Sequence, residues 1–139
     1  MKKNVVIRIT NIQSEGPQMV ENHEVTTKGT FTGNENDYTL NYIELFDENT
    51  KSNTTIRVNK KTVTLIRQGD FNYEFIIEQN SRHNCHYETP YGEFMLGIYG
   101  KSVESTVTEN GGVLRLNYTL DFNAGFASEN EMTIEFSVI

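Results

Sequence analysis

Residues 103–122 read VESTVTENGGVLRLNYTLDF and contain the clearest structural signal in the chain. Apolar and polar residues alternate on both sides of the pair Asn110-Gly111. Strict alternation is typical of a half-buried strand, and an Asn-Gly pair readily adopts the positive φ angles of a tight hairpin turn. This stretch therefore predicts two antiparallel strands joined by a short turn.

The same alternation recurs outside this hairpin, and no segment shows the apolar period of a helix. Further strands are predicted at 5–9, 25–31, 38–46, 56–58, 63–67, 71–77, 87–89, 94–98 and 132–138, with polar stretches at 47–53 and 78–84 and a break at Gly100. Strands with short links favour antiparallel neighbours, and a sheet this long curls into a barrel or splits into a sandwich. We expect a single all-β domain over residues 1–139, an antiparallel meander barrel of about 8–10 strands.

Length and composition set limits on function. The chain has 139 residues, 36% of them hydrophobic, and a net charge of −7. Such a charge disfavours binding to nucleic acid, because phosphate recognition needs concentrated Lys and Arg. No run approaches the roughly 20 apolar residues of a membrane-spanning helix, so membrane insertion is not expected. The single cysteine, Cys85, fits a reducing compartment, and we expect a cytoplasmic protein.

An ordered set of short segments resembles the YwiB-like family, small uncharacterised proteins of low-GC Gram-positive bacteria. The matching segments are Leu40-Asn41-Tyr42-Ile43-Glu44, Thr55-Ile56-Arg57-Val58, Ile66-Arg67-Gln68-Gly69, Tyr87-Glu88-Thr89-Pro90-Tyr91-Gly92 and residues 111–120. The resemblance implies a calycin-like or lipocalin-like barrel, in agreement with the strand pattern, and it implies no activity. The Gly-x-Trp signature of true lipocalins is absent, because the chain has no tryptophan.

Two charged residues fall on the apolar parity of their strands. Glu44 shares parity with the apolar residues of 38–46, and Arg67 shares parity with those of 63–67. A lone buried charge costs several kcal/mol, so each should meet the other or a ligand. One interpretation is an ion pair, hydrogen-bonded to Tyr42, Tyr87 or Tyr118, that closes one barrel end. The other is an anchor at which Arg67 binds a carboxylate or phosphate and nearby phenols add hydrogen bonds.

Aromatic residues at alternate positions could form core or wall a pocket. They are Phe71, Tyr73, Phe75, Tyr87, Phe94, Tyr118, Phe122 and Phe136. An eight-stranded barrel is just wide enough to be filled by side chains or to hold one small ligand, and the sequence leaves both open.

The segment His83-Asn84-Cys85-His86 is the one place that hints at chemistry. Structural zinc needs four ligands, and no pattern supplies the rest, so we predict neither a metal nor a cofactor. Cys85 and His86 are adjacent, and in a strand they would point to opposite faces, which argues against a nucleophile–base pair. No phosphate loop, nucleophile elbow or dinucleotide fingerprint appears, and an enzyme is not expected.

The leading hypothesis is a non-enzymatic barrel that binds a small apolar or amphipathic ligand in its interior, with an acidic head group as one option. The alternative is a filled barrel that acts as a protein-interaction module through an outer apolar patch near Tyr91, Tyr99 or Phe126. Self-association through an exposed edge strand is a further option that one sequence leaves open.

Overall fold

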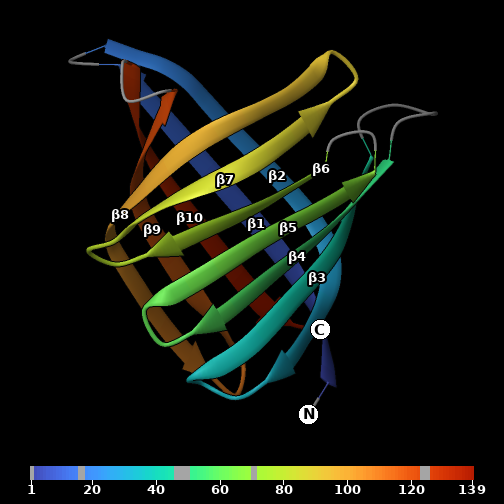
Figure 1. Ribbon diagram of the computed structural model, residues 1–139. Coiled ribbons are helices and arrows are strands. Elements are labelled where there is room, and N and C mark those ends of the chain that lie inside the picture. Colours follow the sequence, from blue (N-terminus) through green and yellow to red (C-terminus); the bar gives the residue numbers. More distant parts are fainter. Residues whose placement is uncertain (1, 16–17, 46–50, 70–71, 123–125) are drawn as a thin grey trace.

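The computed structural model describes residues 2–15, 18–45, 51–69, 72–122 and 126–139. These residues form ten strands, which close into one antiparallel barrel (Figure 1). The strands are β1 (Lys2–Glu15), β2 (Gln18–Gly33), β3 (Asp37–Leu45), β4 (Lys51–Asn59), β5 (Thr62–Gly69), β6 (Asn72–Glu78), β7 (Arg82–Thr89), β8 (Gly92–Thr108), β9 (Gly111–Phe122) and β10 (Phe126–Val138). Each strand pairs with the next one along the chain, and β1 closes the barrel against β10. The predicted all-β meander barrel is confirmed.

One end of the barrel is filled by side chains. Phe31, Tyr38 and Phe136 stack there, with centroid distances of 5.3 Å and 5.4 Å from Phe31 to the other two rings. The Tyr38 hydroxyl also shares a hydrogen bond of 2.7 Å with Ser105 Oγ. Around these rings pack fully buried aliphatic residues, namely Val5, Ile7, Leu40, Val58, Val63, Ile77, Val103, Leu114 and Leu116. Alternate positions face outward, so the period of two seen in the sequence becomes the inside and outside of the barrel.

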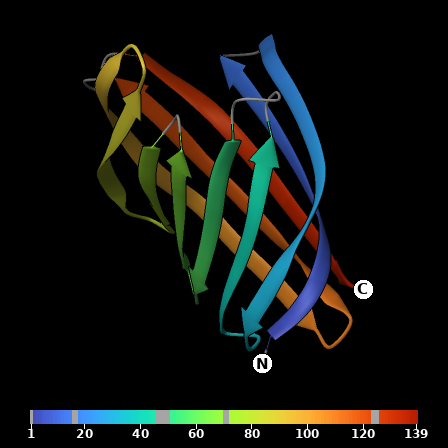
Figure 2. The same ribbon diagram turned by 90° about the vertical axis from the view of Figure 1, so that its right-hand side faces the viewer.

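Strands β2 and β3 are paired along only part of their length. Their register runs from Gly33–Tyr38 to Gly29–Tyr42, whereas residues 18–28 of β2 pair with β1. Figure 2 shows the two strands side by side at one end and diverging toward the other. The barrel wall is therefore less continuous at the end opposite the filled core.

The predicted break at Gly100 is wrong. Strand β8 continues through it from Gly92 to Thr108, with a register shift against β9 between Gly100 and Ser102. The Gly100 N–H donates to the Ser81 carbonyl at 3.1 Å, and a Cβ here would collide with the Glu78 carbonyl. Glycine is needed because the β6–β7 turn packs directly on the backbone of β8, and the extra residue is accommodated as a bulge.

The two predicted polar stretches are also shorter than expected. Residues 51–53 already belong to β4 and residues 82–84 to β7, while 46–50 lie outside the described residues. Ser52 is fully buried in β4. It occupies an inward position of the strand, but hydropathy does not identify it as inward because the residue is polar.

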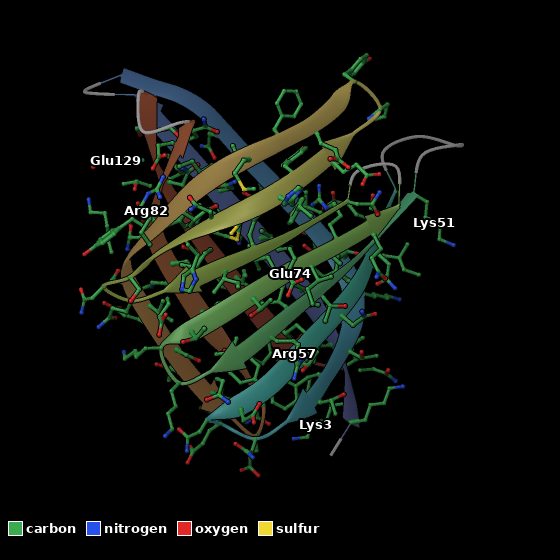
Figure 3. The ribbon with its side chains drawn as sticks, in the orientation of Figure 1. Lys3, Lys51, Arg57, Glu74, Arg82 and Glu129 are labelled. Carbon is green, nitrogen blue, oxygen red and sulfur yellow. The ribbon has the colours of Figure 1, made fainter. Side chains whose placement is uncertain are left out.

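Charged side chains cover the outer face, as Figure 3 shows for Arg57, Glu74 and Arg82. Arg82 on β7 forms an ion pair of 2.7 Å with Asp121 on β9, across β8. Within the part of the chain that the structure describes, no helix is long and apolar enough to cross a bilayer. Because β1 and β10 pair with each other, neither terminal strand is an edge strand of the barrel.

Candidate functional site

A cavity of about 360 Å³ lies inside the barrel, at the end opposite the stacked rings. Its wall combines apolar and polar side chains from nine of the strands. They are Ile9, Asn11, Gln13, Val25, Tyr42, Glu44, Thr54, Ile56, Leu65, Arg67, Tyr73, Phe75, Tyr87, Tyr118, Leu120, Asn130 and Met132. The interior is thus neither wholly filled nor wholly hollow.

All five residues predicted as a binding site line this one cavity, namely Tyr42, Glu44, Arg67, Tyr87 and Tyr118. Their inward direction follows from parity, and the structure adds that they lie at the same end of the barrel. Whether they bind a ligand stays a prediction.

Glu44 and Arg67 meet across strand β4. Arg67 Nη2 lies 3.4 Å from Glu44 Oε2, and the side chains are 19% and 12% exposed, respectively. On β4, Thr54 is the register partner of Arg67 and Ser52 that of Glu44. Both β4 residues are small and buried, so they leave room for the longer side chains to reach each other.

Aromatic rings continue the wall beside Arg67. The guanidinium carbon lies 5.2 Å from the centroid of the Tyr73 ring, within reach of a cation–π interaction. Tyr73 stacks on Phe75 at 4.0 Å and on Tyr87 at 5.6 Å. The sequence placed Tyr73 only among the aromatic residues that could form core or wall a pocket, and not with the five predicted binding residues. Pairing of β5 with β6 sets it directly opposite Arg67, and this register is the signal that a sequence pattern alone lacks.

Three phenols of the cavity wall, those of Tyr42, Tyr73 and Tyr118, stay protonated at neutral pH. Burial raises the pKa values of Tyr42, Tyr73 and Tyr118, and the Glu44 carboxylate raises that of Tyr42 further. At neutral pH these side chains are therefore uncharged hydroxyls. They can donate a hydrogen bond to an acceptor without repelling an anion.

Sequence reasoning missed the polar residues that β1 and β10 contribute. Asn11 Oδ1 is buried and has no hydrogen-bond partner among the described residues. Asn130 is 4% exposed and donates from Nδ2 to Ser128 Oγ at 3.2 Å. A signal was present, because Ile9, Asn11 and Gln13 continue the inward parity of β1 beyond the strand end that was predicted.

The aromatic residues do not all share one environment. Tyr73, Phe75, Tyr87 and Tyr118 line the cavity, whereas Phe136 belongs to the filled end. Phe94, expected in the core or a pocket wall, is 45% exposed instead. Phe94 lies near the start of β8, at the end of the strand. There a residue on the inward face of the strand is no longer covered by other side chains. Phe71 and the side chain of Phe122 lie outside the described residues.

The segment around Cys85 shows no reactive arrangement. Cys85 is 3% exposed, and its Sγ accepts a hydrogen bond from the Ile76 N–H at 3.5 Å. Burial raises the pKa of this thiol, which disfavours the nucleophilic thiolate. His83 Nε2 contacts Glu78 Oε1 at 2.9 Å, while His86 is exposed. Among the described residues, no group of three or more His, Cys, Asp or Glu side chains could hold a metal ion.

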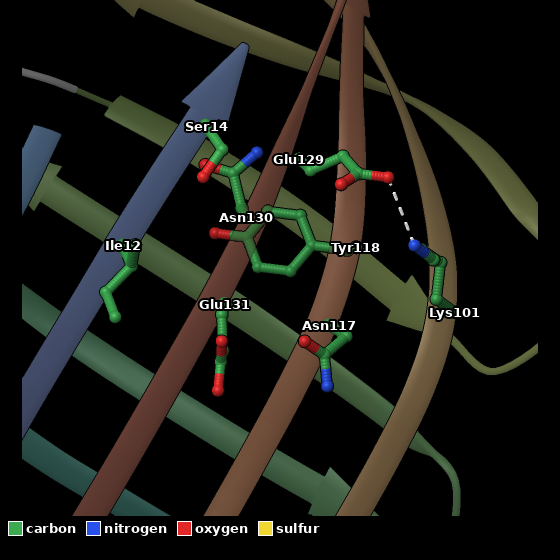
Figure 4. Close-up of a pocket in the computed structure, with 8 residues that line it drawn as sticks. All are labelled: Ile12, Ser14, Lys101, Asn117, Tyr118, Glu129, Asn130 and Glu131. Atoms are coloured by element: carbon green, nitrogen blue, oxygen red, sulfur yellow. Dashed lines mark hydrogen bonds and ion pairs between the residues drawn. The ribbon is translucent and has the colours of Figure 1, made fainter. Parts of the chain in front are cut away.

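A second, smaller depression of about 110 Å³ lies beside β8, β9 and β10 (Figure 4). The ion pair between Lys101 Nζ and Glu129 Oε1, at 3.2 Å, crosses β9 there. Tyr118 and Asn130 line both this depression and the interior cavity. Its size and polar lining suit a few water molecules better than an organic ligand.

Comparison with known proteins agrees with the fold. The crystal structure of the ywiB protein from Bacillus subtilis superimposes with a TM-score of 0.87 over 99% of this chain and 93% of that chain, at 20% sequence identity. At this identity the likeness shows the fold alone. No curated protein matches the sequence. A family model described as "Domain of unknown function (DUF1934)" matches residues 7–134. The resemblance to the YwiB-like family is confirmed.

Proposed function

The chain belongs to the DUF1934 family, and we propose that this barrel is a non-enzymatic protein that binds one small amphipathic ligand in its interior cavity. The observation that carries the proposal is the cavity itself. Its volume of about 360 Å³ lies within the range of known ligand pockets, which begins near 300 Å³. An empty cavity in a protein interior normally lowers the stability of the fold. The presence of this cavity beside charged groups therefore supports a role in ligand binding.

The lining supports an amphipathic rather than a purely apolar ligand. Ile56, Leu65 and Phe75 offer apolar contacts. Arg67, Glu44 and the neutral phenols offer charge and hydrogen bonds on the same wall. A ligand with a short apolar tail and a polar head could bury the tail while its head replaces the water that these groups would otherwise bind.

Binding is favoured over catalysis for chemical reasons. The one thiol is buried with a raised pKa, and the described residues that line the cavity include neither a histidine nor a cysteine. The carboxylate among the described lining residues, that of Glu44, already contacts the Arg67 guanidinium at 3.4 Å in an ion pair. A buried free thiol also suits a reducing environment, and we propose that the protein acts in the cytoplasm.

Isothermal titration calorimetry with octanoate and with octanol tests the proposal. We expect saturable binding of at least one compound at one site per chain. Met132 lines the cavity with a flexible side chain, so this position should accept a larger one. Replacement of Met132 by Trp should then fill the cavity and abolish that binding. A variant of the exposed Met95 to Trp, on the barrel exterior, is the matched control. Absence of saturable binding, or binding that Met132→Trp leaves intact, would refute an interior site.

A protein-interaction role is the second candidate, and exposed residues near the β7–β8 turn favour it. Tyr91 is 91% exposed, and Phe94 and Met95 are each 45% exposed. The predicted patch also included Tyr99 and Phe126. Tyr99 is 37% exposed, and the side chain of Phe126 lies outside the described residues. Sedimentation over a range of concentrations would detect self-association through this surface. If the protein sediments as a monomer at all concentrations, and Tyr91→Ser does not change this result, the interaction role does not consist of self-association.

A further inference from the structure

The cavity wall changes from polar to apolar in the direction of the filled end. On several strands, a lining residue with a polar group is followed, two positions nearer the filled end, by an apolar lining residue. These pairs are Asn11 and Ile9 on β1, Thr54 and Ile56 on β4, Arg67 and Leu65 on β5, Tyr73 and Phe75 on β6, and Asn130 and Met132 on β10. Strand β9 has the opposite order, with Leu120 nearer the open end than Tyr118. A ligand therefore meets a mainly polar layer first and a mainly apolar layer below it.

The apolar layer is one residue deep on these strands. The next inward residues belong to the filled core and are at most 2% exposed, namely Ile7, Val58, Val63, Ile77 and Ile134. Successive inward residues of a strand lie about 6.6 Å apart along it. The apolar part of the cavity is therefore about one such step deep, and a closely packed core lies beneath it.

Ile56 and Leu65 form the floor of the cavity on β4 and β5. They are register partners, and their exposed fractions are 1% and 4%. Val58 and Val63, the inward residues directly below them, are register partners too. The side chains of Ile56 and Leu65 thus separate the cavity from the core on this side of the barrel.

This depth limits the apolar part of a ligand. With C–C bonds of about 1.5 Å, an extended alkyl chain crosses one layer with about five carbons, and a chain of about eight carbons reaches from the polar layer to the floor. A longer chain has to fold back over the polar layer or displace the floor into the core. The first covers polar groups with hydrocarbon, among them the buried Asn11 Oδ1, which has no hydrogen-bond partner among the described residues. The second overpacks the core.

We propose that the cavity selects its ligand by the length of the apolar tail, that it accepts tails of up to about eight carbons, and that Ile56 and Leu65 set this limit. This inference rests on the proposed binding function and narrows its ligand to short-chain amphiphiles. Long-chain lipids are excluded by the floor rather than by the head group.

Two homologous series test the limit by calorimetry with the intact protein. They are hexanoate, octanoate, decanoate and dodecanoate, and the 1-alkanols of the same lengths, each kept below its solubility or micelle limit. Within a series the head group is constant, so differences in affinity report the tail. In the series that binds, we expect affinity to rise at least about fivefold from the hexyl to the octyl compound, as burial of two further methylenes requires. It should then rise less than twofold from decyl to dodecyl.

Variants of the floor should move the limit in opposite directions. Leu65→Ala lowers the floor, so the decyl compound should gain at least about fivefold over the octyl compound, as in a deeper apolar layer. Ile56→Phe raises the floor, so the octyl compound should lose its advantage over the hexyl compound. Ile66→Ala is the matched control, because Ile66 follows Leu65 on the same strand and points to the opposite face. It should leave the chain-length profile of the parent unchanged.

The outcomes separate the two levels of the argument. If no compound of either series saturates, the binding function itself fails. If affinity continues to rise by the same factor from octyl to dodecyl, the protein binds ligands but the depth limit is wrong. If Leu65→Ala and Ile56→Phe are folded by circular dichroism and both keep the parent's chain-length profile, these residues do not set the limit and the proposal is overturned. A shift in either variant alone, in the stated direction, supports it when the other does not fold.

Discussion

Arg67 on β5 and Glu44 on β3 are separated by a whole strand and still form an ion pair, with 3.4 Å between Nη2 and Oε2. The pair passes over Ser52 and Thr54, the small buried residues that β4 places between them. Any larger residue at these two β4 positions would occupy the space that the pair crosses. The charged wall of the cavity therefore depends on four residues from three adjacent strands.

Removal of the carboxylate should destabilise the fold. Glu44→Gln takes away the anionic partner of a largely buried guanidinium, and we expect the free energy of unfolding to fall by about 1–3 kcal/mol, less than for a fully buried pair. Urea denaturation measures this change. Glu74→Gln, on the outer face, should stay within about 0.5 kcal/mol of the parent. Equal effects of the two substitutions would show that the pair adds no stability.

The filled end should carry much of the stability. Phe136→Ala removes a ring that stacks on Phe31 at 5.4 Å, and it should cost about 3–5 kcal/mol in the free energy of unfolding. Phe94→Ala removes the same side chain from a half-exposed position and should cost less than about 1 kcal/mol. Thermal or urea unfolding compares the two. A small loss in Phe136→Ala would place the main core elsewhere.

The bulge in β8 should be sensitive to a single methyl group. Gly100→Ala would drive a Cβ against the Glu78 carbonyl, which is backbone and cannot move independently, and we expect a loss of about 1–3 kcal/mol. Lys101→Ala is the neighbouring control, because its exposed ammonium forms only a surface ion pair with Glu129. Chemical denaturation distinguishes them. A Gly100→Ala variant as stable as the control would mean that the β6–β7 turn can shift away from β8.

Stability should fall in alkaline solution because of buried phenols. The pKa values of Tyr38, Tyr42, Tyr73 and Tyr118 are raised in the folded state, chiefly by burial. Below the unfolded pKa of about 10 this contribution to stability is fully present. Above it the unfolded chain ionises first, so stability is lost progressively until the folded-state pKa values are reached.

Urea midpoints measured at about pH 8 and about pH 11 test this dependence, with pH values chosen on either side of the phenol pKa. The parent should lose stability between them, and Tyr118→Phe should lose less because one titrating phenol is gone. Identical losses in the two proteins would show that Tyr118 ionises as easily in the folded state as in the unfolded state.

Cys85 should react slowly in the native protein. The thiol is buried and its pKa is raised, so both access and thiolate population are reduced. Labelling with a disulfide reagent at about pH 8 should proceed at least about tenfold faster in urea than in buffer. The labelling rate in native conditions is read by absorbance, and Cys85→Ala gives the background. Equally fast labelling of the native protein would place the thiol at the surface.

Much of this protein follows from the period-2 pattern of its sequence. The alternation predicted strands without helices, an antiparallel meander and a closed barrel, because the side chains of a strand point alternately to its two faces. The same parity assigned Tyr42, Glu44, Arg67, Tyr87 and Tyr118 to the interior, where all five lie. Hydropathy failed where inward positions are polar, as at Asn11 and Ser52, since such residues look exposed in a sequence.

Other features depend on how the strands are arranged around the barrel. Parity gives the side of a strand but not the height along the barrel axis, so only the registers between β3, β4 and β5 place Glu44 within reach of Arg67. The contact of Tyr73 with Arg67 depends in the same way on the β5–β6 register. Whether the interior is filled or hollow is decided by the summed volumes of side chains from nearly all strands, and no local pattern contains that sum. The sequence alone therefore determined the inward face of the apolar strand segments, and the tertiary structure decided which inward residues meet and where a cavity remains.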